Sequence, residues 1–293
     1  LTVSPKTMNT FGNSNPVRYS IYAESSKKLY IPKYYGLQNF GKPDVNKLLD
    51  GIDVNIKFNG DLRENQIKPV EKFLESARDP NKMGGLINLG CAAGKTVISL
   101  NIISQLGKKT LVVVHKDFLL KQWKERIEQF LPDARVGLIK AKVIDIEDKD
   151  IVMASLQSLS MKEYDKGTFD EFGLLVCDEV HNFAAEVFSR ALFKTNFKYS
   201  LGLSATITRK DGLSKVFKWH LGDIVYRNAK KKVDIVNVEC HEYHNQNPIY
   251  SQEVLLPFNN KPNMARMINN ICDFPDRTEY IVNIIKNIKK KEN

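Results

Sequence analysis

The fold of this chain is indicated most clearly by one run, Leu86-Ile87-Asn88-Leu89-Gly90-Cys91-Ala92-Ala93-Gly94-Lys95-Thr96-Val97-Ile98. It consists of a short apolar stretch, then small residues ending in Gly-Lys-Thr, then an apolar-periodic segment. This order predicts a strand, a tight loop and a helix. Such loops bind phosphate, because backbone N–H groups, the positive end of the helix dipole and a lysine ammonium can all face one anion.

The loop departs from the strict G-x-x-x-x-G-K-[ST] spacing, which puts its first glycine where Leu89 stands. A small-residue loop that only caps a helix therefore remains an alternative. In the phosphate-binding interpretation, Lys95 supplies a full charge and the hydroxyl of Thr96 faces a magnesium ion. The loop residues that surround the phosphate are Gly90, Cys91, Ala92, Ala93 and Gly94.

Length and composition limit the class of protein. A chain of 293 residues with 42% hydrophobic residues is expected to form a soluble globular protein with one large domain plus an attachment, or two domains. No run approaches the roughly 20 apolar residues that cross a bilayer, and the N-terminus lacks a secretory pattern. The four cysteines are scattered, which predicts a reducing intracellular setting.

The charge of the chain favours a polyanionic partner. Forty-four Lys and Arg residues against thirty-four Asp and Glu residues give a net charge of +10 at pH 7. A lysine-rich solvated surface without such a partner is the alternative. A zinc site formed by Cys240, His241, His244 and Cys272 is disfavoured because the ligand spacing is poor.

The N-terminal region is expected to contain two strands. Residues 1–16 show little periodicity, whereas the segments 17–22 and 29–35 alternate around a polar break at 24–28. Interleaved tyrosines and lysines in these segments could stack on bases and neutralise phosphates. The favoured interpretation is that the tyrosines build one face of a small sheet.

The central part of the chain alternates helices and strands. A helix is expected from Gly60 toward Ala77, and an amphipathic helix over 118–130. Apolar runs predict further strands at 110–114, 151–154, 174–177 and 199–203. This alternation predicts an α/β fold with a doubly wound parallel sheet, whose ligands bind at the carboxyl ends of the strands.

Two carboxylates follow one of these strands in the motif Asp178-Glu179-Val180-His181. At the exit of a buried strand, one carboxylate can hold a magnesium ion and the other can take a proton from an attacking water. An exposed acidic helix start is the alternative. The phosphate loop upstream favours the catalytic interpretation.

Taken together, Gly94-Lys95-Thr96, Asp178-Glu179-Val180-His181 and Ser204-Ala205-Thr206, with Gln66 upstream, resemble the first motor domain of superfamily 2 helicases of the DExH type. The resemblance covers roughly Leu62 to Gly212. It is closest to the branch containing the XPB-like repair and transcription helicases and the transcript-release helicases of large DNA viruses. A RecA-like fold is therefore implied, and the richness in Asn, Ile and Lys is compatible with a viral source.

The resemblance implies a role for each matched residue in an ATP site. Gln66 with Arg63 would read the adenine edge, and Lys95 would contact the β- and γ-phosphates. Thr96 and Asp178 would hold Mg²⁺, and Glu179 would be the general base. Coupling between the γ-phosphate and the motor domains would involve His181, Ser204 and Thr206, and contacts to the nucleic-acid backbone would involve Lys116, Ser155, Gln157 and Arg209.

Two positions depart from the family pattern. His115-Lys116 stands where Pro followed by Thr or Ser is common, which weakens the assignment of phosphate contacts there. Ala92 stands where a further glycine is common, and alanine is expected only if its φ stays negative.

The expected organisation is an N-terminal β-containing module over 1–60, the RecA-like domain over 61–245, and a linker with the start of a second motor domain over 246–293. No Gly-Arg-x-x-Arg element, which in the family supplies arginine fingers, follows Gly212. A basic helix is expected over 213–219, an extended segment over 233–243 and a terminal helix from Asp276. The chain is therefore expected to be a fragment that binds ATP and hydrolyses it weakly without the second motor domain.

The expected function is an ATP-dependent helicase or translocase. DNA is favoured over RNA as the track, and the transcription machinery is a further candidate partner. Three alternatives stay open: a translocase that remodels protein–nucleic-acid complexes without unwinding, a binding module that uses nucleotide as a switch, and a nucleotide kinase or metabolic ATPase.

Overall fold

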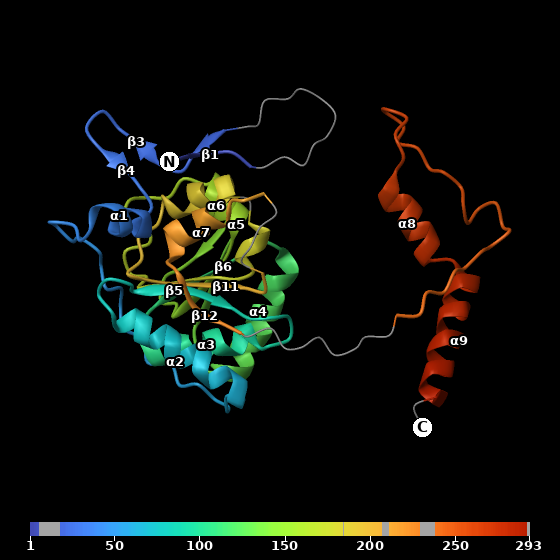
Figure 1. Ribbon diagram of the computed structural model, residues 1–293, viewed down its shortest axis with the longest axis horizontal. Helices are drawn as coiled ribbons and strands as arrows, with labels where there is room; N and C mark the ends of the chain where they lie inside the picture. The colour runs from blue at the N-terminus through green and yellow to red at the C-terminus, as the bar shows by residue number, and fades with distance from the viewer. Residues whose placement is uncertain (6–17, 184, 207–210, 229–237, 292–293) are drawn as a thin grey trace. The chain divides into compact units, whose positions relative to one another are not determined.

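The computed structural model describes residues 1–5, 18–183, 185–206, 211–228 and 238–291. Contacts within the chain divide it into two units, Leu1–Ala229 and Lys230–Asn293. Each unit is described by itself below (Figure 1). The three domain ranges expected from the sequence stay predictions.

The first unit is built on one mainly parallel sheet. Among the described residues this sheet has eight strands in the order β12-β5-β11-β10-β6-β9-β7-β8. Neighbouring strands are parallel except β8, which runs antiparallel to β7. The strands are β5 (Gly84–Asn88), β6 (Thr110–Val114), β7 (Val136–Lys140), β8 (Val143–Asp145), β9 (Ile151–Ser155), β10 (Leu174–Cys177), β11 (Tyr199–Ser204) and β12 (Ile224–Arg227).

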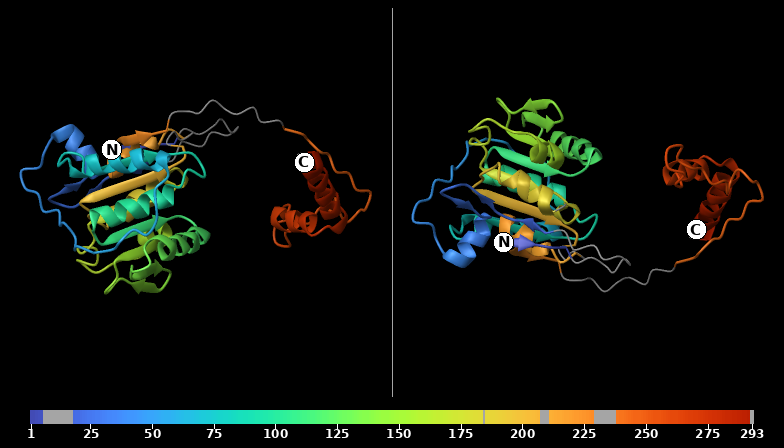
Figure 2. Two further views of the ribbon diagram at one scale, coloured as in Figure 1. Left: turned by 90° about the horizontal axis from the view of Figure 1, so that it is seen from below. Right: turned by 90° about the horizontal axis from the view of Figure 1, so that it is seen from above.

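Helices cover both faces of this sheet (Figures 1 and 2). Successive strand residues point to opposite faces, so Ile87 and Val112 join one core cluster while Leu86 and Leu111 join the other. The first cluster contains residues of α2 (Glu64–Arg78), α3 (Lys95–Leu106) and α4 (Asp117–Phe130). The second contains residues of α5 (Leu156–Met161), α6 (Ala185–Leu192) and α7 (Ser214–Leu221).

The predicted α/β fold with a doubly wound parallel sheet is confirmed. The strands expected from unbroken apolar runs all occur, and β6 and β9 are buried along their whole length. The strands β7, β8 and β12 were not predicted. In β7 only alternate residues are buried, and β8 is exposed throughout, so neither carries the apolar signal of a central strand.

The N-terminal strands are shorter than expected and pair differently. β1 (Thr2–Val3) pairs with β2 (Tyr19–Ser20), and β3 (Ala23–Glu24) pairs with β4 (Leu29–Tyr30). The expected extension of the last strand through residue 35 is wrong, because Pro32 caps helix α1 (Lys33–Phe40).

Helix α1 joins the N-terminal region to the core. Tyr34 is buried, and its hydroxyl lies 2.8 Å from that of Ser200 in β11. Lys33 donates a hydrogen bond of 2.9 Å to the carbonyl oxygen of Lys198 and a longer one to that of Phe197. The aromatic and basic residues at the start of α1 therefore pack against the protein itself.

Lys33 should make the stability of the first unit depend on pH. Burial lowers the pKa of its ammonium group from 10.5 to about 7. Between these values the unfolded chain binds a proton that the folded chain does not, so the free energy of unfolding should rise from pH 7 to pH 10. Chemical denaturation across this range measures the effect, which corresponds to about one proton.

The Lys33→Met variant is the control, because its free energy of unfolding should not rise between pH 7 and pH 10. The neighbouring groups stay neutral in the same range: burial raises the pKa of Tyr34 and lowers the pKa of His220 to about 3. Lys198, next to the Lys33 hydrogen bonds, is paired with Asp50 at 2.7 Å. A parallel pH dependence in wild type and variant would contradict the assignment.

The second unit contains α8 (Met264–Cys272) and α9 (Pro275–Lys291). The expected terminal helix is confirmed by α9, and the expected basic helix over 213–219 by α7. Residues 238–243 form no regular element, and the rest of the expected extended segment lies outside the described residues. None of the helices within the described ranges has the length and apolar character needed to span a bilayer.

Candidate functional site

The loop between β5 and α3 turns through two left-handed residues, Ala92 and Gly94. Gly94 caps α3 in the left-handed region with φ 78°, and a Cβ there would lie 2.1 Å from the amide nitrogen of Gln66. Glycine is therefore required at this position both for the backbone conformation and for the close approach. Of the other loop residues expected around the phosphate, Gly90 and Cys91 are exposed, and Ala93 is partly buried.

The expectation that Ala92 keeps a negative φ is wrong, because its φ is 59°. The loop takes the same left-handed turn that a glycine would take, and the alanine Cβ is strained against the backbone. A left-handed conformation costs an alanine roughly 1–2 kcal/mol. Strain of this kind is found at functional loops that the surrounding structure holds in place.

Replacing Ala92 with glycine should raise the free energy of unfolding by up to about 1 kcal/mol. The relief of strain exceeds the extra entropy that glycine gives the unfolded chain. Urea denaturation measures the change. Ala93→Gly is the matched control and should lower stability, because Ala93 is not among the residues with positive φ. A loss of stability in Ala92→Gly would contradict the strain.

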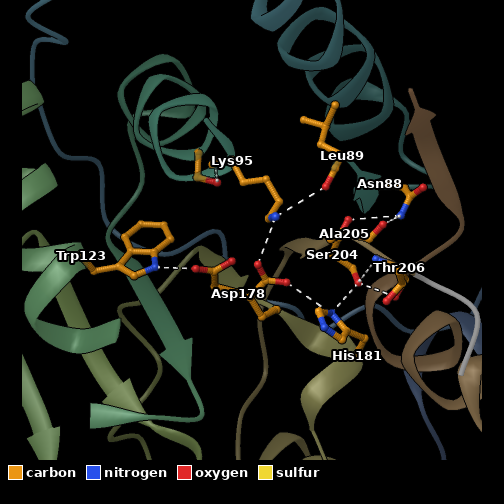
Figure 3. Close-up of polar contacts among 11 residues, drawn as sticks. Asn88, Leu89, Lys95, Trp123, Asp178, His181, Ser204, Ala205 and Thr206 are labelled. Atoms are coloured by element: carbon orange, nitrogen blue, oxygen red, sulfur yellow. Dashed lines mark hydrogen bonds and ion pairs between the residues drawn. The ribbon is translucent and has the colours of Figure 1, made fainter. Parts of the chain in front are cut away.

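Lys95 and Glu179 bring the two sequence motifs together. Lys95 is the first residue of α3, and its ammonium lies 3.0 Å from Oε1 of Glu179 and 3.5 Å from the carbonyl oxygen of Leu89 (Figure 3). Both side chains are mostly buried, at 9% and 23% exposure. The carboxyl ends of β5 and β10 therefore place the lysine and the acidic pair at one point, as the sequence predicts.

Asp178 is held by a residue that sequence reasoning missed. Its Oδ2 accepts a hydrogen bond of 2.8 Å from the indole nitrogen of Trp123 in α4 (Figure 3). Its Oδ1 is buried and has no hydrogen-bond partner within the described part of the chain. Burial raises the pKa of this carboxyl group. A buried, unpartnered carboxylate oxygen is suited to a cation.

Glu179 stands at the start of a short network. Its backbone is left-handed with φ 52°, and its side chain contacts Lys95 and His181. Nδ1 of His181 lies 3.2 Å from Oε2 of Glu179 and 3.0 Å from the hydroxyl of Ser204. The hydroxyl of Ser204 donates to the carbonyl oxygen of Thr206 at 2.6 Å. The residues predicted to couple the γ-phosphate to the motor domains thus form one connected chain.

A second residue missed by sequence reasoning is Asn88, the last residue of β5. Its side-chain amide donates to the carbonyl oxygens of Ser204 at 3.2 Å and Ala205 at 3.1 Å (Figure 3). It therefore ties the Ser-Ala-Thr segment to the strand that leads into the phosphate loop. An asparagine at the end of an apolar strand was the available signal, because a partly buried amide is expected to form hydrogen bonds.

Arg63 and Gln66 line the pocket beside the loop. The side-chain oxygen of Gln66 accepts from the backbone N–H of Arg63 at 2.9 Å, and its amide nitrogen donates to the carbonyl oxygen of Ala93 at 3.4 Å. Gln66 is 3% exposed, so its amide here connects α2 to the phosphate loop. The pocket has a volume of about 720 Å³ and also contains Lys95, Thr96, Asp178 and Glu179.

The residues predicted to contact nucleic acid have mixed surroundings. Lys116 is exposed and caps α4, and the amide of Gln157 donates to the carbonyl oxygen of His115 at 3.4 Å. Ser155 is 7% exposed, and its hydroxyl caps α5 by accepting from the N–H of Ser158. Arg209 lies outside the described residues. Lys116 and Gln157 follow the carboxyl ends of β6 and β9, and Ser155 is the last residue of β9.

The four residues considered for a zinc site, Cys240, His241, His244 and Cys272, lie in the second unit. In the part of the chain that the structure describes, no group of three or more His, Cys, Asp and Glu side chains could hold a metal ion. Cys240 and Cys272 are both exposed free thiols. Magnesium does not need such a group, because it usually takes one or two protein ligands together with water and phosphate oxygens.

Comparisons with known proteins find a family profile and similar sequences. The profile of the family "Type III restriction enzyme, res subunit" matches residues 59–209. A putative ATP-dependent RNA helicase of Acanthamoeba polyphaga mimivirus is 30% identical over 98% of this chain and 56% of its own length. The DNA 3'-5' translocase XPB2 of Sulfurisphaera tokodaii is 34% identical over 61% of this chain and 38% of its own length.

Among solved structures, the UvsW helicase from bacteriophage T4 has the same fold. It aligns with a TM-score of 0.51 and 18% identity over 74% of this chain and 84% of that chain. The chain spans about half the length of the first curated relatives it matches.

Proposed function

This chain belongs to the family of the type III restriction enzyme res subunit and is related to superfamily 2 helicases, and from this we propose that it is the ATP-binding part of a nucleic-acid helicase or translocase. The observation that carries the proposal is the 3.0 Å contact between Lys95 and Glu179. A phosphate-binding lysine and a candidate base that touch can act on one bound triphosphate.

The side chains around this contact divide the work of hydrolysis. Lys95 and the backbone of the loop bind the β- and γ-phosphates of ATP. Glu179 orients the attacking water and takes its proton. The contact of Glu179 with both Lys95 and His181 keeps its carboxylate at the mouth of the loop. Arg63 and Gln66 line the same pocket, and the resemblance to the helicase family implies that they bind the adenine of ATP.

Thr96 and Asp178 fit the role of magnesium ligands. Both line the same pocket, and Oδ1 of Asp178 is an unpartnered oxygen of the hard type that Mg²⁺ prefers. Magnesium bound there supplies positive charge to the phosphate oxygens. Asp178 and Thr96 would hold the ion at the phosphates, and the carboxylate of Glu179 would not be a ligand of the ion and would take the proton.

The track of the motor is proposed to be DNA rather than RNA. The net charge of +10 supports a polyanion of either kind, and the names of the relatives include both an RNA helicase and a DNA translocase. Titrating the ATPase of the full-length protein with single-stranded DNA, duplex DNA and RNA tests the choice. Stimulation by RNA alone would overturn it, and no stimulation by any of them would favour a metabolic ATPase.

A strand-displacement assay in parallel separates the two kinds of motor. Unwinding of a labelled duplex with ATP identifies a helicase. ATP hydrolysis that clears a bound protein from duplex DNA without unwinding identifies a remodelling translocase. Binding of nucleotide with no product release would favour a nucleotide-switched binding module. That result would overturn the proposal that the protein is a helicase or translocase.

We further propose that a second motor domain completes the site. This chain covers only 56% and 52% of the lengths of the first two curated relatives, and the resemblance to the helicase family implies that a second motor domain supplies arginine fingers. An arginine finger is worth roughly 10³–10⁵ in rate. The full-length protein should therefore hydrolyse ATP faster than residues 1–293 alone by a factor in that range, and equal turnover would contradict the proposal.

A further inference from the structure

The hydrogen bond between Trp123 and Asp178 joins a core helix to the candidate magnesium ligand. Trp123 is 1% exposed and lies in the core cluster that α4 shares with the sheet. A buried indole N–H needs an acceptor, and here the acceptor is one oxygen of a carboxylate that is itself 5% exposed. The pairing is thus formed between two buried groups with little competition from water.

This bond makes the two oxygens of Asp178 unequal. Oδ2 is occupied by the indole, while Oδ1 remains without a hydrogen-bond partner among the described residues. The backbone of Asp178 is fixed as well, because its N–H donates to the carbonyl oxygen of Val113 at 3.0 Å. With the backbone and one oxygen held, rotation of the carboxylate is restricted, and Oδ1 is the oxygen left for a ligand.

We propose that Trp123 is a positioning residue for the magnesium site, which holds Oδ2 of Asp178 so that Oδ1 binds the ion. The inference rests on the proposed function, because it assumes that Asp178 binds magnesium with ATP. Tryptophan suits this role because its N–H only donates and cannot itself bind the ion. Groups that orient a metal ligand in this way typically change metal affinity by 10- to 100-fold when they are removed.

A purely structural role for Trp123 predicts a different result. The side chain is large and fully buried, so its loss by truncation would disturb the core whatever its N–H does. The two roles separate when the ring is kept and only the N–H is removed. Benzothienylalanine does this with a sulfur atom in place of the indole nitrogen. Trp123→Phe also removes the N–H, but its smaller ring leaves a cavity as well.

The test measures binding of a non-hydrolysable fluorescent ATP analogue to the full-length protein as Mg²⁺ is titrated. Benzothienylalanine at position 123 should raise the half-maximal Mg²⁺ concentration by roughly 10- to 100-fold, with nucleotide affinity in the absence of metal unchanged. Trp123→Phe should shift it in the same direction. Trp219→Phe, which alters the other tryptophan of this chain, is the matched control and should leave it unchanged.

The double variant Asp178→Asn with Trp123→Phe adds a second criterion. If the indole acts through Asp178, the half-maximal Mg²⁺ concentration of the double variant should be no higher than that of Asp178→Asn alone. An unchanged Mg²⁺ dependence in the benzothienylalanine protein would overturn the inference while leaving the proposed function intact. An equal loss of nucleotide affinity in the benzothienylalanine protein with and without Mg²⁺ would also overturn the inference. Absence of nucleotide binding in the wild type would overturn both.

Discussion

Glu179→Gln should lower the ATPase rate of the full-length protein by roughly 10²- to 10⁴-fold while nucleotide remains bound. The amide keeps the size of the side chain but cannot accept a proton from water at neutral pH. Lys95, which lies 3.0 Å from Oε1, keeps an oxygen partner in this variant, so the phosphate contacts should survive. Steady-state hydrolysis together with nucleotide titration measures both effects.

Glu186→Gln is the matched control for this substitution. Glu186 lies on α6 and pairs at 2.8 Å with Arg190 on the protein surface, where both side chains are half exposed. The hydrolysis rate of the Glu186→Gln variant should equal that of the wild type, because exposed ion pairs of this kind contribute little to stability. Equal hydrolysis by wild type and Glu179→Gln would remove Glu179 from the role of base.

Lys95→Ala should weaken nucleotide binding by about 2 to 4 kcal/mol, which is roughly 30- to 1,000-fold in Kd. The substitution removes the ammonium group that is proposed to contact the phosphates from the start of α3. It also leaves Glu179 without its strongest partner in a mostly buried place, so the apoprotein should lose stability. Calorimetric titration and thermal denaturation measure the two consequences.

The double variant Lys95→Ala with Glu179→Gln distinguishes these effects. It removes the unpaired charge, so stability should recover in part while nucleotide binding stays weak. Lys124→Ala, which breaks a surface contact to Glu128 of 3.8 Å on α4, is the control and should change neither quantity. Tight nucleotide binding by Lys95→Ala would contradict the phosphate-binding role.

The sequence was sufficient to predict the strands that carry the site. Unbroken apolar runs identified β6, β9, β10 and β11, and parallel strands end at the same edge of a sheet. That rule predicts that Lys95 and Glu179 lie at the same edge of the sheet. It needs no knowledge of side-chain packing, because it depends only on where each strand ends.

Contacts that depend on how a helix is rotated were not predictable in this way. Trp123 belongs to the apolar face of α4, and the period of that face does not show which of its residues meets Asp178. The φ of Ala92 was predicted with the wrong sign, because local preference is weaker here than the closure of the loop. The predicted strand over residues 29–35 was wrong for a related reason. The tertiary contacts of α1 outweighed the alternating pattern of apolar and polar residues there.

Helix α4 spans two places that the proposed motor must keep in step. It begins beside Lys116, on the side expected to grip the track, and about 10 Å further along its axis it presents Trp123 to Asp178. A helix of this length moves largely as one rigid body. A displacement of its first turn would therefore also displace the indole that holds Oδ2 of Asp178, which links the proposed nucleic-acid contact to the proposed magnesium ligand.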